Sequence, residues 1–79
     1  ILELVDGTMP VDEFEDRTGI RKLRGKGDFH TIAGFAINEF GHLPAAGEAF
    51  TFGRHRFEVV DMDGLRIDKL LVASLMPDE

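Results

Sequence analysis

A chain of 79 residues has room for one hydrophobic core, and its 43% apolar and 30% charged residues are typical of a folded globular domain. The formal net charge of −6 and the absence of Trp and Tyr argue against a nucleic-acid-binding module, which needs cations for phosphates and aromatic rings for bases. The absence of cysteine excludes disulfides and thiolate chemistry, and no apolar run approaches the ~20 residues of a membrane-spanning helix.

The N-terminal segment predicts a strand and a short helix. Residues 1–5 read as a strand that ends at an Asp-Gly turn. Asp12 is expected to cap the following helix, and Glu15 three residues later would complete a capping-box pair. Gly19 is expected to end this helix.

A basic loop is predicted next. Residues 21–28 hold two glycines and four cations, which favours a flexible, solvated segment. Within it, Gly25-Lys26-Gly27 is similar to a fragment of a phosphate-binding loop, but the Lys-Ser/Thr pair that opens a helix in such loops is missing. A solvated loop is therefore the simpler interpretation.

The second helix is the clearest element of the sequence. Thr31 is a favourable N-cap, residues 32–40 are apolar on most sides, Gly41 stands at the C-cap, and Pro44 prevents continuation. A helix of this kind is buried in a core. Gly34 costs roughly 1 kcal/mol of helix propensity relative to Ala, and we expect close backbone packing to compensate.

Three strands are predicted after this helix, at residues 48–52, 55–62 and 65–75. The two turns fall at Gly53-Arg54 and at Asp63-Gly64, and the second is a strong hairpin signal. A two-residue turn there would pair Met62 with Leu65, Asp61 with Arg66, Val60 with Ile67, Val59 with Asp68 and Glu58 with Lys69. The order β-α-α-β-β-β predicts an α+β domain in which two helices pack on an antiparallel sheet.

The start of the second helix is the best candidate for an anion site. Free backbone N–H groups at residues 31–33 would face the anion, and Gly34 would allow its close approach. Arg66 and Asp68 lie two residues apart and are expected on one face of the last strand. Arg66 would pair there with Asp61 or Asp68, or recognise a ligand.

No catalytic constellation can be assembled from this sequence. His30, His42 and His55 have no second His or Cys at ligand spacing, so surface or capping roles are the simpler interpretation. Ser74 is the only serine, and nothing supports a Ser/His/Asp arrangement around it. We therefore predict no catalytic residues and no enzymatic activity.

The acidic segments predict weak cation binding at most. Residues 61–64 are similar to the start of an EF-hand loop, but the third ligand and the Glu at loop position twelve are missing. A weakly bound Mg²⁺ or Ca²⁺ is also conceivable at the carboxylates Asp12, Glu13, Glu15 and Asp16. An acidic helix start is the commoner reason for such a run, so no dedicated metal site is predicted.

Several short segments, taken in order and spacing, resemble a known family. They are Asp6-Gly7, Met9 to Phe14, Thr31 to Phe35, Gly41 to Pro44, Gly47-Glu48, Arg56 to Val60 and Met62 to Asp68. Together they resemble the CorC/HlyC transporter-associated domain, the C-terminal module of bacterial proteins related to magnesium and cobalt efflux and of hemolysin-like proteins. The resemblance covers nearly the whole chain.

This resemblance implies a setting for the domain. Residues 1–79 are expected to be a single domain excised from a larger protein, where it follows CBS domains on the cytoplasmic side of the inner membrane. Only the parent protein would contact the membrane. The resemblance also implies a fold similar to part of the FAD-binding domains of the PCMH type.

Three functions are compatible with these expectations. The leading one is a non-enzymatic regulatory module of an ion efflux or hemolysin-like protein, which needs no cofactor and acts by contacts with CBS domains or with a second copy. Such a homodimer would use Phe and Leu side chains exposed on the sheet. The alternatives are binding of FAD or an adenine nucleotide at Thr31, Gly34, Arg66 and Asp68, and sensing of divalent cations by surface carboxylates.

Overall fold

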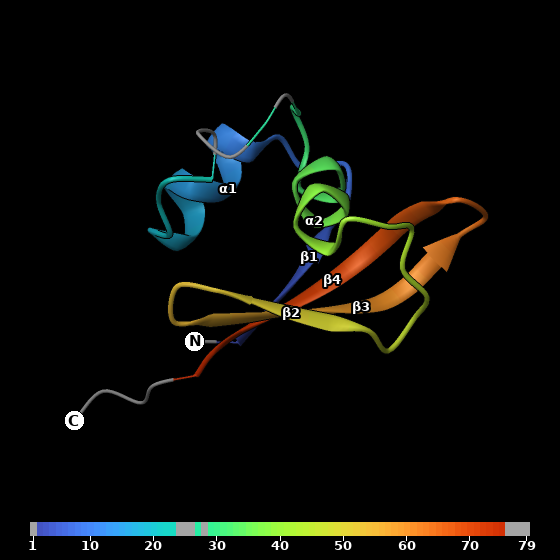
Figure 1. The fold of residues 1–79 in the computed structure, drawn as a ribbon. Coiled ribbons are helices and arrows are strands. Elements are labelled where there is room, and N and C mark those ends of the chain that lie inside the picture. Colours follow the sequence, from blue (N-terminus) through green and yellow to red (C-terminus); the bar gives the residue numbers. More distant parts are fainter. Residues whose placement is uncertain (1, 24–26, 28, 76–79) are drawn as a thin grey trace.

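The computed structural model describes residues 2–23, 27 and 29–75 and contains the predicted succession of elements (Figure 1). They are β1 (Leu2–Asp6), α1 (Val11–Thr18), α2 (Ile32–Phe40), β2 (Ala49–Phe52), β3 (His55–Asp63) and β4 (Arg66–Ser74). The α+β class and the order β-α-α-β-β-β are therefore confirmed. No helix in the described part of the chain is long and apolar enough to span a membrane.

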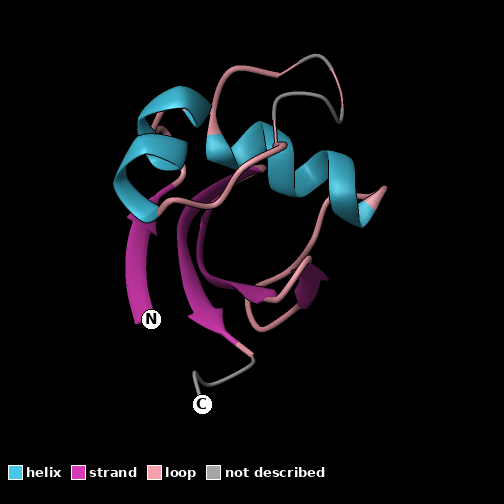
Figure 2. Ribbon diagram, turned by 90° about the vertical axis from the view of Figure 1, so that its left-hand side faces the viewer, coloured by secondary structure: helices cyan, strands magenta, loops and turns pink. Residues whose placement is uncertain are grey.

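The four strands form one antiparallel sheet in the order β1-β4-β3-β2. Both helices lie on the same side of this sheet (Figure 1), and the strands curve beneath them (Figure 2). The similarity to part of the PCMH-type FAD-binding fold stays a prediction.

The core lies between α2 and the sheet and is built around Phe35, which is fully buried. Its ring contacts those of Phe29, Phe50, Phe52 and Phe57, with ring centroids 5.1–5.8 Å apart and edge-to-face geometry. Aromatic rings favour this arrangement because the positive edge of one ring meets the negative face of the next. The other large, fully buried side chains are Phe14, Phe57, Leu23, Ile32, Ile67, Leu70, Val5, Val11, Val59 and Val72.

Helix α1 begins two residues earlier than predicted. Its N-cap is Pro10, whose side chain makes no capping hydrogen bond, and Asp12 lies within the first turn, so the prediction that Asp12 caps the helix is wrong. The N–H of Val11 donates instead to the carbonyl of His30 at 2.8 Å, which supplies the missing cap from a distant segment. Gly19 ends the helix as predicted, with φ of 80°.

Glu15 is buried, with only 8% of its surface exposed, and is not part of a capping box. Its Oε2 accepts a hydrogen bond from the N–H of Leu23 at 3.1 Å, and Leu23 is itself fully buried. The prediction of a solvated loop is therefore wrong at Leu23. Residues 24–26 and 28, including most of the segment similar to a phosphate-binding loop, lie outside the described residues.

Helix α2 has the predicted bounds and caps. Thr31 Oγ1 accepts the N–H of Gly34 at 3.2 Å, and Gly41 ends the helix with φ of 76°. A Cβ on Gly34 would lie 2.9 Å from the Cβ of Phe29, which is closer than side chains approach one another. The predicted close packing at Gly34 is therefore confirmed, with the side chain of Phe29 as the neighbour.

The β3–β4 hairpin differs from the predicted register. The turn residues are Gly64 and Leu65, so that Asp63 pairs with Arg66 and Met62 with Ile67. Gly64 has φ of 63°, whereas Leu65 has no positive φ, which is the pattern of a type II′ turn with Gly in its first central position. A turn centred on Asp63-Gly64 would have required the left-handed region at Asp63.

Both strands of this hairpin also carry an irregularity, between Val59 and Met62 on β3 and opposite it on β4. Val59 is buried and Met62 packs against the core three residues later, and the same spacing separates the buried Ile67 and Leu70. In a regular strand, two side chains three residues apart point to opposite faces of the sheet. An extra residue on each strand is therefore needed for both members of each of these two pairs to face the core. The apolar spacing thus explains the double irregularity.

Candidate functional site

The N-terminus of α2, the predicted anion site, is closed by the connection between β1 and α1. The N–H groups of Ile32 and Ala33 donate to the carbonyls of Met9 and Gly7, each at 2.9 Å. The next N–H is taken by the hydroxyl of Thr31. The expectation that the amides of Ile32 and Ala33 are free for an anion is wrong, because distant backbone carbonyls use them.

Gly7 stands at the centre of this closure. Its carbonyl binds Ala33, and its N–H donates to the carbonyl of Asp68 on β4 at 2.8 Å. A Cβ at this position would overlap the carbonyl oxygen of Ile67 and lie 3.2 Å from the Cβ of Ala33. Only glycine fits between the hairpin and α2, which the Asp-Gly turn signal alone did not reveal.

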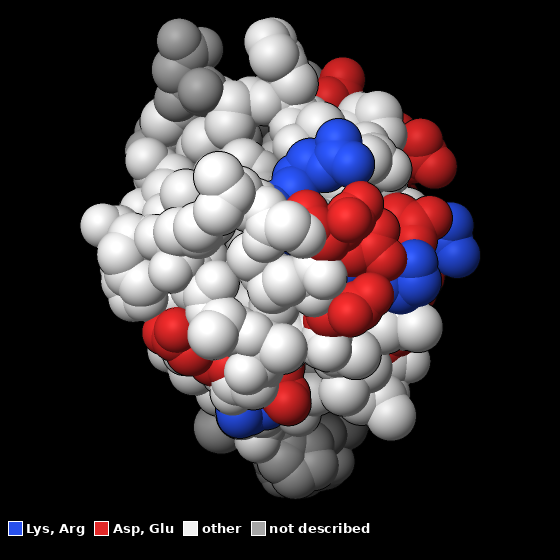
Figure 3. Space-filling view, turned by 90° about the vertical axis from the view of Figure 1, so that its right-hand side faces the viewer, with Lys and Arg blue, Asp and Glu red and all other residues white. Residues whose placement is uncertain are grey.

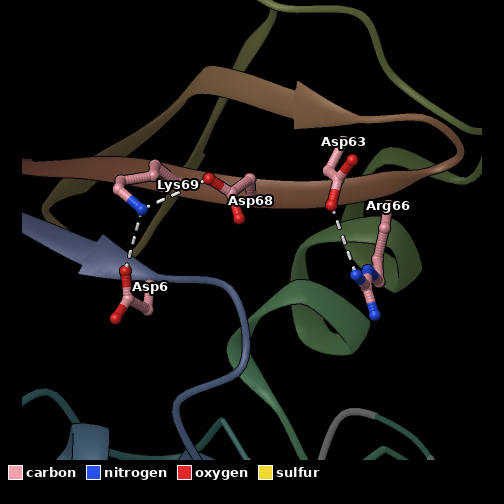
Figure 4. A network of polar contacts seen from close by, with 5 residues as sticks. All are labelled: Asp6, Asp63, Arg66, Asp68 and Lys69. Atoms are coloured by element: carbon pink, nitrogen blue, oxygen red, sulfur yellow. Dashed lines mark hydrogen bonds and ion pairs between the residues drawn. The ribbon is translucent and has the colours of Figure 1, made fainter.

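Charged side chains line the end of the sheet beside this junction (Figure 4). Lys69 Nζ lies 3.2 Å from Asp6 Oδ1 and 3.2 Å from Asp68 Oδ2. Hydrogen bonds to Asp6 and then to Asp68 raise the pKa of Lys69, because both carboxylates favour the protonated amine.

Arg66 lies at the tip of the hairpin and pairs with Asp63, whose Oδ2 is 3.4 Å from Nη2. The expectation that Arg66 pairs with Asp61 or Asp68 is wrong, because the turn is centred one residue later than predicted. Both side chains are about two-thirds exposed, at 69% for Arg66 and 66% for Asp63. The pair therefore contributes little to stability.

The four predicted cofactor-binding residues do not surround a common cavity. Asp68 reaches the start of α2 only through the backbone of Gly7, whereas Arg66 extends from the hairpin tip. Thr31 uses its hydroxyl as a helix cap, and Phe29 fills the space beside Gly34. The described residues form no pocket, so the binding of a nucleotide by these residues stays a prediction.

Acidic side chains gather on one side of the molecule, with Lys and Arg side chains between them (Figure 3). No group of three or more metal-ligating side chains occurs among the described residues. Of the acidic run in α1, Asp12, Glu13 and Asp16 are exposed, but Glu15 is turned inward toward Leu23. Weak binding of Mg²⁺ or Ca²⁺ stays a prediction, without Glu15 as a ligand.

The three histidines are exposed or half-buried and show no catalytic arrangement. His42 follows α2 and links the end of this helix to β2: its Nε2 lies 2.9 Å from Glu48 Oε1, and its Nδ1 lies 3.1 Å from the carbonyl oxygen of Phe40. The N–H of Ala45 donates to Glu48 Oε2 at 2.9 Å. This N–H and then His42 lower the pKa of Glu48.

Comparison with known proteins gives one family for residues 4–75, that of the CorC_HlyC transporter associated domain. UPF0053 protein sll0260 from Synechocystis is 46% identical over 77 residues, which are 95% of this chain and 17% of that protein. The polyamine export protein of Salmonella typhimurium is 38% identical over 72 residues, 91% of this chain and 16% of that protein. The chain therefore spans about a sixth of the length of these relatives.

Among solved structures, the transporter associated domain of a Xylella fastidiosa Temecula1 hemolysin, in complex with Mg²⁺ and Mn²⁺, has a TM-score of 0.83 to this chain. The two are 41% identical, and the match covers 95% of this chain and 89% of that one. The topology described above is thus that of a solved domain.

Proposed function

The chain belongs to the CorC_HlyC transporter associated domain family, and from this membership we propose that it is a non-enzymatic regulatory domain of a larger, membrane-associated efflux or hemolysin-like protein. The observation that supports this most strongly is the family match over residues 4–75, combined with relatives about six times longer than the chain.

The cargo of the parent is a cation in this proposal. The family resemblance suggests Mg²⁺ or Co²⁺, and the name of the Salmonella relative adds polyamines, which are organic cations. The domain would lie on the cytoplasmic side of the inner membrane beside CBS domains of the same parent. It would shift the parent between states only by making better contacts with one of them.

A deletion in the parent protein tests this role. Cells that express the parent with and without this domain are challenged with Mg²⁺, Co²⁺ and a polyamine, and cation efflux is measured at equal amounts of inserted protein. We expect altered efflux of one cation class in the deletion variant. Unchanged efflux of all three would contradict a regulatory role.

Cation sensing is a second candidate, favoured by the Mg²⁺ and Mn²⁺ in the Xylella domain and by the exposed carboxylates of this chain. Titration with Mg²⁺, followed by amide chemical shifts, should give saturable changes near Asp12 to Asp16 or near Asp61 to Asp63. The double variants D12N/D16N and D61N/D63N would assign the segment, and changes that persist in both would contradict a site at either one.

Nucleotide binding through Thr31, Gly34, Arg66 and Asp68 remains the alternative inherited from fold similarity. Calorimetric titration with FAD and with ATP tests it, with R66A as the matched variant because Arg66 is exposed. Heat that disappears in R66A would support this alternative. No heat at millimolar ligand would remove it.

A further inference from the structure

One histidine side chain links the end of α2 to the start of β2. Phe40 is the last residue of α2, so its carbonyl has no partner within the helix. His42 Nδ1 lies 3.1 Å from this carbonyl oxygen, and His42 Nε2 lies 2.9 Å from Oε1 of Glu48, the residue before β2. Each nitrogen of the imidazole ring therefore faces an oxygen atom of a different segment.

Both of these oxygen atoms can only accept a hydrogen bond. A backbone carbonyl carries no proton, and neither does an ionised carboxylate. A neutral imidazole has one N–H group and makes one of the two hydrogen bonds, whereas an imidazolium ion has two N–H groups and makes both. The geometry around His42 thus matches the protonated ring.

Glu48 remains an acceptor throughout the pH range in which an imidazole titrates. The N–H of Ala45 and then the ring of His42 lower the pKa of Glu48 below its usual value of 4.5. An ordinary imidazole titrates at about pH 6.5. Near neutral pH, the proton that is gained or lost in this pair is therefore one on the imidazole.

Glu48 is the one charged side chain of the described chain that bonds to His42. The titratable residue of α2, Glu39, makes no hydrogen bond or ion pair with His42, and β2 contains no titratable residue. On the neighbouring β3, Arg56 and Glu58 pair with each other at 2.7 Å. His42 therefore faces one carboxylate and the C-terminal end of one helix, both of which attract a positive charge.

We propose that His42 is a proton-dependent cap of α2, which links the helix end to Glu48 only while both ring nitrogens carry a proton. When the ring loses one proton, Nε2 keeps its N–H, because a hydrogen bond to a charged carboxylate is stronger than one to a neutral carbonyl. Nδ1 then turns a lone pair toward the carbonyl oxygen of Phe40, and this hydrogen bond is lost. A rise in pH through the titration of the imidazole removes the cap, and a fall in pH restores it.

The cap controls a surface segment. Within residues 41–47 only Pro44 is buried, and Leu43 is 46% exposed. The far end of the segment stays attached to β3, because the N–H of Gly47 donates to the carbonyl of Val59 at 2.8 Å. Loss of the cap thus loosens one end of this segment without opening the core, and the domain presents a pH-dependent surface to its parent.

Hydrogen exchange of the 79-residue chain between about pH 5.5 and about pH 8 tests the cap. The amide of Gly41 is the reporter, since it donates to the carbonyl of Ile37 at 2.9 Å and closes the end of α2. Its protection factor, which corrects for the intrinsic effect of pH on exchange, should fall about threefold as the pH rises, because one exposed hydrogen bond is lost. In His42→Gln, which has no titrating ring, the protection factor should not change with pH.

A matched control leaves His42 as the only histidine. The double variant H30Q/H55Q should keep the full fall in the protection factor of Gly41, because neither of the two replaced side chains bonds to the end of α2. A constant protection factor in the unchanged chain would overturn the proposal. An equal fall in H42Q, or no fall in H30Q/H55Q, would also overturn it.

Nitrogen-15 spectra of the imidazole ring test which proton is lost. We expect both ring nitrogens of His42 to be protonated at about pH 5.5, and the neutral ring at about pH 8 to carry its proton on Nε2. A neutral ring with its proton on Nδ1 would contradict the proposed loss of the cap. Each of these failures leaves the proposed role of the domain in a transporter intact.

Discussion

The two faces of the sheet are built from adjacent residues of the same strands but have different roles. Val5, Leu70 and Val72 are at most 1% exposed and form the core with Phe57, whereas Leu4 is more than half exposed. Burial of the first set stabilises the folded domain. The exposed Leu4 contributes much less to folding.

The largest expected effect is a difference in stability between substitutions at two adjacent leucines whose side chains lie on opposite faces of the sheet. Leu70→Ala should lower the free energy of unfolding by about 2–5 kcal/mol, because it leaves a cavity in the core. Leu71→Ala, on the half-buried outward side, should cost less than about 1 kcal/mol in dilute solution. Urea unfolding measures both. Equal losses would show that the outward face of the sheet is as important for folding as the face covered by the helices.

The second effect tests the junction between the covered face and α2. Gly7→Ala should cost about 2–3 kcal/mol, because the added methyl group overlaps the carbonyl oxygen of Ile67, which cannot move without distorting the hairpin. Adding Ala33→Gly removes the milder contact only and should not restore stability. If G7A/A33G recovered the full stability of the unchanged chain, the steric overlap of the added methyl group would be with Ala33 of α2 and not with the hairpin.

A third effect concerns the buried carboxylate on the helical side. Glu15→Ala should cost about 1–3 kcal/mol, because the N–H of Leu23 loses its acceptor inside the core. Glu15→Gln keeps an acceptor oxygen and should lose less. Hydrogen exchange at Leu23 reports the contact directly, and unchanged protection in E15A would contradict this assignment.

The smallest expected effect concerns Glu48, in the connection between α2 and β2. Because the pKa of Glu48 is lowered in the folded chain, its ionised form stabilises the fold above the usual value of 4.5. This contribution is lost as the pH falls through the lowered pKa. Glu48→Gln should flatten the decrease of stability at acid pH. His42→Ala should keep part of the decrease, because the N–H of Ala45 still stabilises the ionised carboxylate. Complete flattening in H42A would contradict this assignment.

Much of the fold was predictable because local signals determine it. Helix α2 was predicted with its bounds, since Thr31 and Gly41 satisfy its terminal groups locally. The class and the order of elements followed from such signals, whereas the family was identified by the resemblance of several short segments. The cap of α1 was not predictable in the same way, because Val11 finds its acceptor at His30.

The candidate site was less predictable, because backbone groups far apart in sequence determine it. From the sequence, the amides at the start of α2 were expected to be free, but in the folded chain the carbonyls of Gly7 and Met9 accept their hydrogen bonds. The partner of Arg66 depended on a turn centred at Gly64 instead of Asp63. A signal for the irregularity of the hairpin was nevertheless present, in the three-residue spacing between Ile67 and Leu70.

The position of Gly7 has a mechanical consequence. Its backbone is bonded to β4 through Asp68 and to α2 through Ala33, so a helix that slides along the sheet must break one of these two hydrogen bonds. This bridge opposes shear between the two layers. We therefore expect the domain to transmit a displacement by rotation as a rigid body.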